Sequence, residues 1–190
     1  MMEAKRLEEA LERQRGYFAS GATLSPEARL SALERLESEV RRREGEMAAA
    51  LYSDLGKSAE EAYMCETGLI LGELSWLRRH LRGLMRERRA HTPLAQFRSR
   101  SFTRPSPLGS VLIMSPWNYP FLLTLEPLAG ALAAGNTAVV KPSAYSPASS
   151  ELLAGMIENC FDPRHVLAVT GGREANSALP DTKNVVALAK

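Results

Sequence analysis

Three short apolar runs, separated by two helix-like stretches, constrain the fold of this 190-residue chain more than any other feature. The runs consist almost entirely of Val, Leu, Ile, Ala and Met, and they occupy residues 111–114, 137–140 and 166–169. Of the intervening stretches, the first runs from about residue 122 to 134 and stops at Gly135, and the second begins at Pro147. Buried strands that alternate with helices form parallel sheets with right-handed crossovers. The sequence therefore predicts an α/β fold with a parallel sheet.

Composition changes near residue 100. Residues 1–100 hold 18 basic and 16 acidic side chains, whereas residues 101–190 hold 6 of each. The first part combines Arg, Glu, Leu and Ala, which is typical of solvated helices with apolar stripes. We expect a helical region over residues 1–97, an extended connection or short hairpin over 98–108, and an α/β region over 109–190. The net charge of +2 is too small to indicate a nucleic-acid partner or an anionic membrane surface.

The helical region carries clear start and stop signals. Ser25 and Pro26 predict the start of one helix, and Gly56 is suited to end it. Ser58 and Glu61 then form a capping box for a second long helix. Its apolar positions recur every three or four residues, at Ile70, Leu74, Leu77, Leu81 and Leu84. This seam is typical of an antiparallel helix pair or a coiled coil, and the arginines of residues 78–89 are expected to lie on the solvated face.

Several classes of site are disfavoured by what the sequence lacks. No apolar run approaches the roughly 18 residues of a membrane-spanning helix, and the start of the chain lacks a secretory core, so we expect a cytoplasmic protein with no membrane segment. Cys65 and Cys160 have no metal-site spacing and are expected to be buried thiols. The three histidines are isolated, which disfavours a metal site and a hidden hydrolase.

Unusual residues follow all three predicted strands. Residues 115–120 follow the first, residues 141–143 the second and residues 170–172 the third. Ligands of open parallel sheets bind beyond the carboxyl ends of the strands, where Lys141 offers a cation and Gly172 permits close approach. A nucleotide would suit such a crevice. Each feature also has a plainer interpretation as core, solvated cation or turn, and neither the G-x-G-x-x-G fingerprint nor a phosphate-binding loop is present.

Four segments together resemble the NAD(P)-dependent aldehyde dehydrogenase superfamily. They read P-W-N-Y-P, P-L, A-L-A-A-G-N and V-K-P-S, at residues 116–120, 127–128, 131–136 and 140–143. The D-L-G-K segment at 54–57, a helix carrying Glu66, and residues 170–172 resemble the class 3 branch. The likeness covers about residues 30–172. It implies the amino-terminal part of that fold, in which a helical region precedes a partial Rossmann-like parallel sheet, and it makes residues 109–190 part of an NAD(P)-binding domain.

The resemblance also implies roles for individual residues in the oxidation of aldehydes to carboxylic acids with NAD or NADP. Asn118 matches the oxyanion-hole donor, and Tyr119 matches the substrate channel. The remaining matches concern the cofactor: they are Ser115, Pro116 and Trp117 in the cleft wall, Lys141 at the adenosine ribose, Ser143 beside it, and Gly172 near the adenine. An aldehyde and a nicotinamide cofactor are thus the implied binding partners.

The chain also departs from the family pattern. Ala144 stands where members usually carry a Glu that shares the ribose hydroxyls, so ribose binding should be weakened. Residues 173–180 do not match, and the segments with the nucleophilic Cys and general-base Glu are absent. Neither Cys65 nor Cys160 matches the nucleophile position, and the chemistry needs a thiolate. We therefore expect a truncated chain, inactive alone, whose hold on NAD or NADP is weakened or lost.

An alternative comes from a different class of protein. The chain could be a non-catalytic helical module that self-associates through the seam from Ile70 to Leu84, with the α/β part as a remnant. A three-stranded open sheet leaves an edge and apolar faces that favour association.

Overall fold

The computed structural model describes residues 2–172 and 186–189. Its centre is a four-stranded parallel sheet in the order β5-β4-β3-β6. The strands are β3 (Ser110–Met114), β4 (Thr137–Lys141), β5 (Val166–Ala168) and β6 (Val186–Ala189). The register pairs Met114 with Lys141, so the carboxyl ends of β3 and β4 lie side by side. The predicted α/β fold and its parallel sheet are confirmed, and the three predicted strands are β3, β4 and β5.

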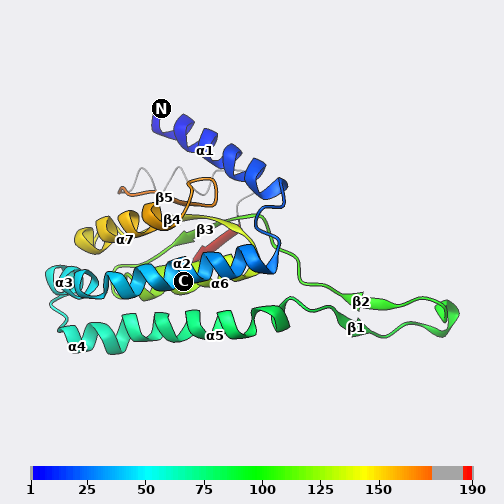
Figure 1. Ribbon diagram of the computed structural model, residues 1–190. Helices are drawn as coiled ribbons and strands as arrows, with labels where there is room; N and C mark the ends of the chain where they lie inside the picture. The colour runs from blue at the N-terminus through cyan, green and yellow to red at the C-terminus, as the bar shows by residue number, and fades with distance from the viewer. Residues whose placement is uncertain (1, 173–185, 190) are drawn as a thin grey trace.

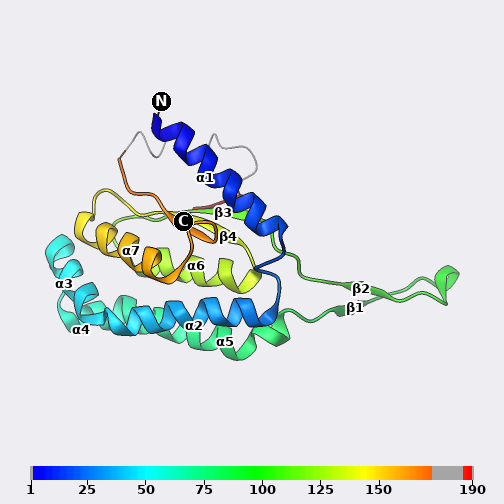
Figure 2. The ribbon, with the colours of Figure 1, turned by 45° about the horizontal axis from the view of Figure 1, so that its top comes forward.

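Helices cover both faces of this sheet (Figures 1 and 2). On one face α1 (Met2–Ala19) contacts β3, and Leu11 packs with Leu112 and Val139 of the sheet. On the other face lie α6 (Leu122–Ala134) and α7 (Pro147–Cys160). These are the two helices expected between the strands. Gly135 ends α6 in the left-handed conformation, with a φ of 86°.

The helices between residues 26 and 84 form an outer layer on α6 and α7. The predicted helix that begins at Pro26 is broken, because α2 (Pro26–Arg42) and α3 (Glu44–Leu55) are separate helices. Arg43 leaves the helical region with φ −104° and ψ 13°, and its guanidinium contacts both Glu39 and Glu46. Helix α3 packs on α7, and α2 packs on both α6 and α7.

The second long helix is confirmed, with a local widening near its start. Ser58 accepts a hydrogen bond from the amide of Glu61 at 3.2 Å and so caps α4 (Ala59–Ala62). A π-helical segment, η1 (Tyr63–Thr67), connects α4 to α5 (Gly68–Leu84). A Cβ on Gly68 would lie 2.9 Å from the carbonyl oxygen of Tyr63, so the wide turn requires glycine there.

The leucine seam of α5 is used inside the chain. Its first four positions are buried, and α5 packs on α2 and α6. Only Leu84, at the end of the seam, is exposed. The alternative hypothesis, in which the chain pairs with a second copy through this seam, is therefore wrong, because the chain's own helices α2 and α6 already cover the seam.

The segment between α5 and β3 forms an arm that projects from the body (Figures 1 and 2). It consists of β1 (Arg88–Ala90), a short 3-10 turn η2 (Leu94–Gln96) and β2 (Ser101–Thr103), and β1 pairs with β2 in antiparallel fashion. The hairpin that the sequence allowed near residue 98 is thus present, and it begins well before that residue. Leu94, Phe97 and Phe102 are exposed on it.

One hydrophobic core joins the helical region to the sheet. Its buried members come from α2, α3, α5, α6, α7 and the inner face of β3 and β4. Among residues 2–172 and 186–189, no helix is long and apolar enough to cross a membrane. Residues 173–180, where a departure from the family pattern was expected, lie outside the described part of the chain.

Candidate functional site

A cavity of about 460 Å³ lies at the carboxyl ends of β3 and β4. Its volume is within the range of small-molecule sites, roughly 300–1,000 Å³. Four of the residues that line it were singled out from the sequence, namely Ser115, Lys141, Ser143 and Gly172. Met114, Ala144 and Tyr145 complete the lining. The parallel pairing of the strands brings these residues together, as expected for the edge where ligands bind in open α/β sheets.

Among the described residues, Lys141 is the only charged one that lines this cavity. It ends β4 and is only 3% exposed, and burial lowers the pKa of its ammonium group. Its Nζ donates to the carbonyl oxygen of Pro142 at 2.9 Å. An ammonium group has three donors. A buried cation with spare donors can therefore bind hydroxyl or phosphate oxygens of a ligand.

Ser115 continues the pairing of β3 with β4 and presents its hydroxyl near the cavity. Its backbone amide donates to the carbonyl oxygen of Lys141 at 3.3 Å, and its Oγ lies 2.6 Å from Oγ1 of Thr124. The Thr124 hydroxyl donates to the carbonyl oxygen of Pro120, so Ser115 must be the donor of the shared bond. The Ser115 oxygen keeps its acceptor capacity, and its position is fixed from both sides.

The loop after β3 carries the other predicted site residues outside this cavity. Trp117 and Tyr119 are 51% and 38% exposed, and Asn118 is exposed between them. None of the three lines the cavity of Lys141. In the described part of the chain no hydrogen bond of the Asn118 side chain is recorded, whereas its backbone carbonyl accepts from Lys57 at 3.0 Å. The predicted convergence thus holds for Lys141 and Gly172 and does not extend to Asn118.

Pro116 faces a separate apolar cavity of about 470 Å³ between β3 and α6. Met114 borders both cavities, so the two adjoin at the end of β3. Within the part of the chain that the structure describes, Glu126 is the only charged side chain in the lining of the apolar cavity. This cavity offers shape and apolar surface, but few polar contacts for a nucleotide.

A buried ion pair beneath the loop was not predicted as part of the site. Nζ of Lys57 lies 2.7 Å from Oε1 of Glu66, whose side chain is fully buried. The other oxygen, Oε2, accepts from the amides of Phe121 and Leu122 at 2.9 and 3.1 Å. The sequence signal was present, because both residues belong to the segments that carry the class 3 likeness, but spacing could not show that they meet the loop after β3.

A second acid of the helical region caps the other crossover helix. Asp54 accepts hydrogen bonds from the amides of Ala148 and Ser149 at 3.1 and 2.8 Å. Both amides lie in the first turn of α7, where backbone donors lack helical partners. Asp54 and Glu66 therefore attach the helical region to the starts of α7 and α6.

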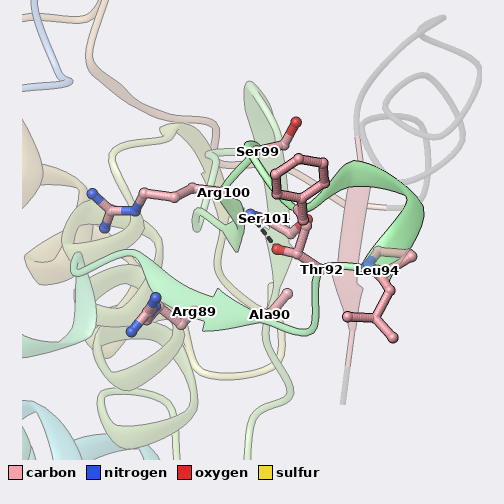
Figure 3. A pocket seen from close by; sticks show the side chains of 9 residues that line it. Arg89, Ala90, Thr92, Leu94, Ser99, Arg100 and Ser101 are labelled. Carbon is pink, nitrogen blue, oxygen red and sulfur yellow. Dashed lines mark hydrogen bonds between the residues drawn. The ribbon is translucent and has the colours of Figure 1, made fainter.

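A further cavity, of about 390 Å³, lies within the arm, as Figure 3 shows. Arg89 and Arg100 line it, and the backbone amide of Ser101 donates to Oγ1 of Thr92 at 3.1 Å across it. The arm projects away from the sheet in Figures 1 and 2, so this cavity is remote from the strand ends.

The cysteines and histidines add no catalytic pair to these cavities. Cys160 is buried as expected, and burial raises the pKa of its thiol to about 11. Cys65 is only half-buried, so the expectation of a buried thiol is wrong for it. It lies in the same π-helical segment as the buried Glu66 and Thr67. Among the described residues, no group of three or more His, Cys, Asp or Glu could hold a metal ion.

Comparison with known proteins identifies the family. The family model described as "Aldehyde dehydrogenase family" matches residues 1–189. The rat protein "Aldehyde dehydrogenase family 3 member A2" is 40% identical over 173 residues, which cover 91% of this chain and 36% of that protein. The Staphylococcus aureus "4,4'-diaponeurosporen-aldehyde dehydrogenase" is 36% identical over 87% of this chain and 36% of its own length. The chain thus spans about a third of the length of these curated relatives.

Solved structures agree with the sequence comparisons. A substrate-bound Staphylococcus aureus AldH superposes with a TM-score of 0.89 at 35% identity, over 91% of this chain and 38% of that one. A glyceraldehyde-3-phosphate dehydrogenase from Methanocaldococcus jannaschii, complexed with NADP, has a TM-score of 0.82 at 23% identity and shows the shared fold. That match covers 96% of this chain and 40% of the Methanocaldococcus jannaschii chain. The resemblance stated from the sequence is confirmed, and the chain belongs to the aldehyde dehydrogenase family.

Proposed function

We propose that this chain supplies the cofactor cleft and the oxyanion donor of an NAD(P)-dependent aldehyde dehydrogenase. One observation carries the proposal. The buried Lys141 ammonium shares a cavity of about 460 Å³ with Ser115, Ser143 and the exposed backbone of Gly172. A cation, two hydroxyls and an unobstructed backbone are the groups that bind ribose hydroxyls and phosphates.

The residues present fit a nicotinamide dinucleotide. Lys141 would hold the adenosine ribose through its spare donors, Ser115 and Ser143 would line the cleft, and Gly172 leaves room for the adenine. When bound, the dinucleotide supplies the hydride acceptor of the oxidation. Ala144 offers no carboxylate to the ribose, so we infer that affinity is lower than in relatives with a Glu there.

Asn118 would act on the substrate rather than on the cofactor. A neutral amide can donate to the oxygen that becomes negative when a thiolate attacks the aldehyde carbonyl, and loss of such a donor typically costs ~3 kcal/mol of transition-state stabilisation. Two features support this role: the Asn118 backbone is fixed by Lys57, and its side chain is exposed. Tyr119 and Trp117 would shape the approach of the aldehyde, and Pro116 the adjoining apolar wall.

The reaction needs two further groups, a nucleophilic thiolate and a general base. By the family resemblance, both belong to segments that these 190 residues do not include. Cys160 is a poor substitute, because its high pKa leaves it protonated near neutral pH. We infer that these 190 residues do not oxidise aldehydes by themselves. The expectation of a cytoplasmic location and that of self-association both stay predictions.

The test combines an activity assay with a binding assay on the same purified chain. Incubation with NAD+ or NADP+ and several aldehydes should form no NAD(P)H, whereas each dinucleotide should bind. Aldehyde-dependent NAD(P)H formation would contradict the inferred inactivity. Absence of binding by either dinucleotide would contradict the proposed cofactor cleft.

A further inference from the structure

We propose that the Lys57–Glu66 pair is a positioning device that fixes the segment from Asn118 to Leu122 and so presents the Asn118 amide in one orientation. The assignment of a catalytic purpose to that orientation rests on the proposed function. The mechanical part, that the pair orders the segment, is carried by contacts among residues of the chain itself.

The two charged groups bind each other and the backbone of this segment. One carboxylate oxygen of Glu66 accepts a hydrogen bond from Lys57, and the other accepts from the amides of Phe121 and Leu122. The ammonium of Lys57 donates to the carbonyl of Asn118 at 3.0 Å and lies 4.0 Å from the centroid of the Tyr119 ring. Four of the five residues from 118 to 122 are therefore in contact with the pair.

The local structure of the helical region is built to bring the two charges to this place. Lys57 follows Gly56, which has a left-handed φ of 70°, in the tight turn between α3 and α4. Glu66 lies in the π-helical segment, whose wide turn depends on Gly68. π-helical turns inside α-helices occur frequently at functional sites.

The arrangement differs from what stability alone would require. A buried ion pair is weak evidence for stabilisation, because well-packed apolar residues of similar volume often serve equally well. An apolar pair could not bind the Asn118 carbonyl or the two amides, however. The distinguishing property of Lys57 and Glu66 is thus directional bonding to the loop backbone, which leaves the Asn118 side chain exposed while its main chain is fixed.

The two tryptophans of the chain make this claim measurable. Trp117 precedes Asn118, and Trp76 lies on α5, so the substitution Trp76→Phe leaves Trp117 as the only tryptophan, which can be excited selectively over the tyrosines. In this background we would measure the fluorescence anisotropy decay of Trp117 and, by NMR, the hydrogen exchange of the Phe121 and Leu122 amides. Neither measurement uses aldehyde or nucleotide, so its failure is distinguishable from failure of the proposed function.

The decisive variant is the double replacement Lys57→Met with Glu66→Leu, which removes both charges and leaves no buried charge unpaired. We expect a folded protein that is less stable than the parent, because the amides of Phe121 and Leu122 and the carbonyl of Asn118 lose their partners. We also expect at least tenfold faster exchange of the two amides and a larger fast component in the Trp117 anisotropy decay. The matched control is Asp54→Asn, which weakens the cap of α7 and should leave the Trp117 loop unchanged.

Three results would overturn the proposal. The first is a folded double variant with parental exchange and anisotropy, which would show that the pair does not order the segment. The second is a double variant that fails to fold, which would assign the pair to global stability. The third is equal loosening of the loop in Asp54→Asn, which would attribute the effect to general weakening of the contact between the helical region and the sheet.

Discussion

The carboxylate of Asp54, near the end of α3, accepts a hydrogen bond of 2.8 Å from the backbone amide of Ser149 in the first turn of α7. The two residues are far apart in the sequence, and they join the outer helical layer to a crossover helix of the sheet. Glu66 likewise accepts hydrogen bonds from the backbone amides of Phe121 and Leu122 at the start of α6. The helical region and the sheet are thus linked at the ends of α6 and α7 that lie nearest the strand-end cavity.

Asp54→Ala should lower the free energy of unfolding by about 1–2 kcal/mol, the usual cost of losing a side-chain cap at a helix start. Chemical denaturation followed by circular dichroism would measure it. Arg82→Ala is the control, since it breaks an exposed ion pair with Glu27 that should contribute less than about 1 kcal/mol. Equal effects of the two substitutions would show that the Asp54 cap is not structurally important.

Gly135→Ala should destabilise the fold for two separate reasons. Gly135 has a φ of 86°, which costs an L-residue roughly 1–2 kcal/mol. A Cβ there would also lie 2.6 Å from Cζ of Arg29, a buried side chain that donates to the carbonyls of Thr23 and Ala133. Thermal or chemical unfolding would measure the sum.

The matched control for that substitution is Gly21→Ala. Gly21 has a φ of 76°, yet its added Cβ would meet nothing closer than 3.6 Å. The excess cost at Gly135 over Gly21 therefore isolates the collision with Arg29. If the two costs were equal, Arg29 would have moved aside freely, contrary to its burial and bonding.

His165 should make stability depend on pH between about 6.5 and 4. Its pKa is lowered from 6.5 to about 4, first by burial and then by the charge of Arg35, with Asp162 opposing. Between these pH values His165 is protonated in the unfolded chain but neutral in the folded chain. The free energy of unfolding therefore falls as pH decreases through this range. The full loss is about 3 kcal/mol, at 1.36 kcal/mol per pKa unit.

Urea unfolding at several pH values would measure this dependence in the parent and in His165→Leu. The difference between the two profiles removes the contribution of the carboxylates that titrate in the same range. We expect the parent to lose stability relative to the variant on acidification. Parallel profiles would show that His165 is protonated equally in both states.

The two cysteines should react with thiol reagents at very different rates. At pH 8 only about one in a thousand Cys160 side chains is ionised, given a pKa of about 11, and the residue is buried. Cys65 is more accessible. We expect one fast thiol per native chain, abolished by Cys65→Ser, and two after denaturation. Fast labelling that persists in Cys65→Ser would mean that α7 opens readily at its end.

Local signals predicted most of the α/β part correctly. Gly135, Pro147 and the apolar runs act within a few residues, so the strands β3 to β5 and the helices α6 and α7 lie where the sequence indicated. The break at Arg43 was missed because no proline marks it. Helix α1 falls within the predicted helical region of residues 1–97, but no separate bounds were predicted for it. The full extent of the arm was missed because its pairing begins before the first proline signal.

The site was predicted in part for the same physical reason. Parallel pairing fixes where strand ends meet, so Lys141, Ser115 and Gly172 could be expected to converge, and they line one cavity. The loop that carries Asn118 is held by residues 55 to 61 positions earlier in the chain, and no local pattern encodes such contacts. For this reason the sequence could not show that Asn118 lies outside the cavity of Lys141.

The central claim is that the strand-end cavity accepts a pyridine dinucleotide, and titration of the chain with NAD+ and NADP+ by ligand-observed NMR tests it most directly. We predict saturable binding, weak and of the order of ~1 mM because Ala144 offers the ribose no carboxylate. Lys141→Ala should abolish it, whereas Arg89→Ala, which removes a cation from the arm cavity, should leave it unchanged. No saturable binding in the parent, or equal binding by a folded Lys141→Ala variant, would contradict the account.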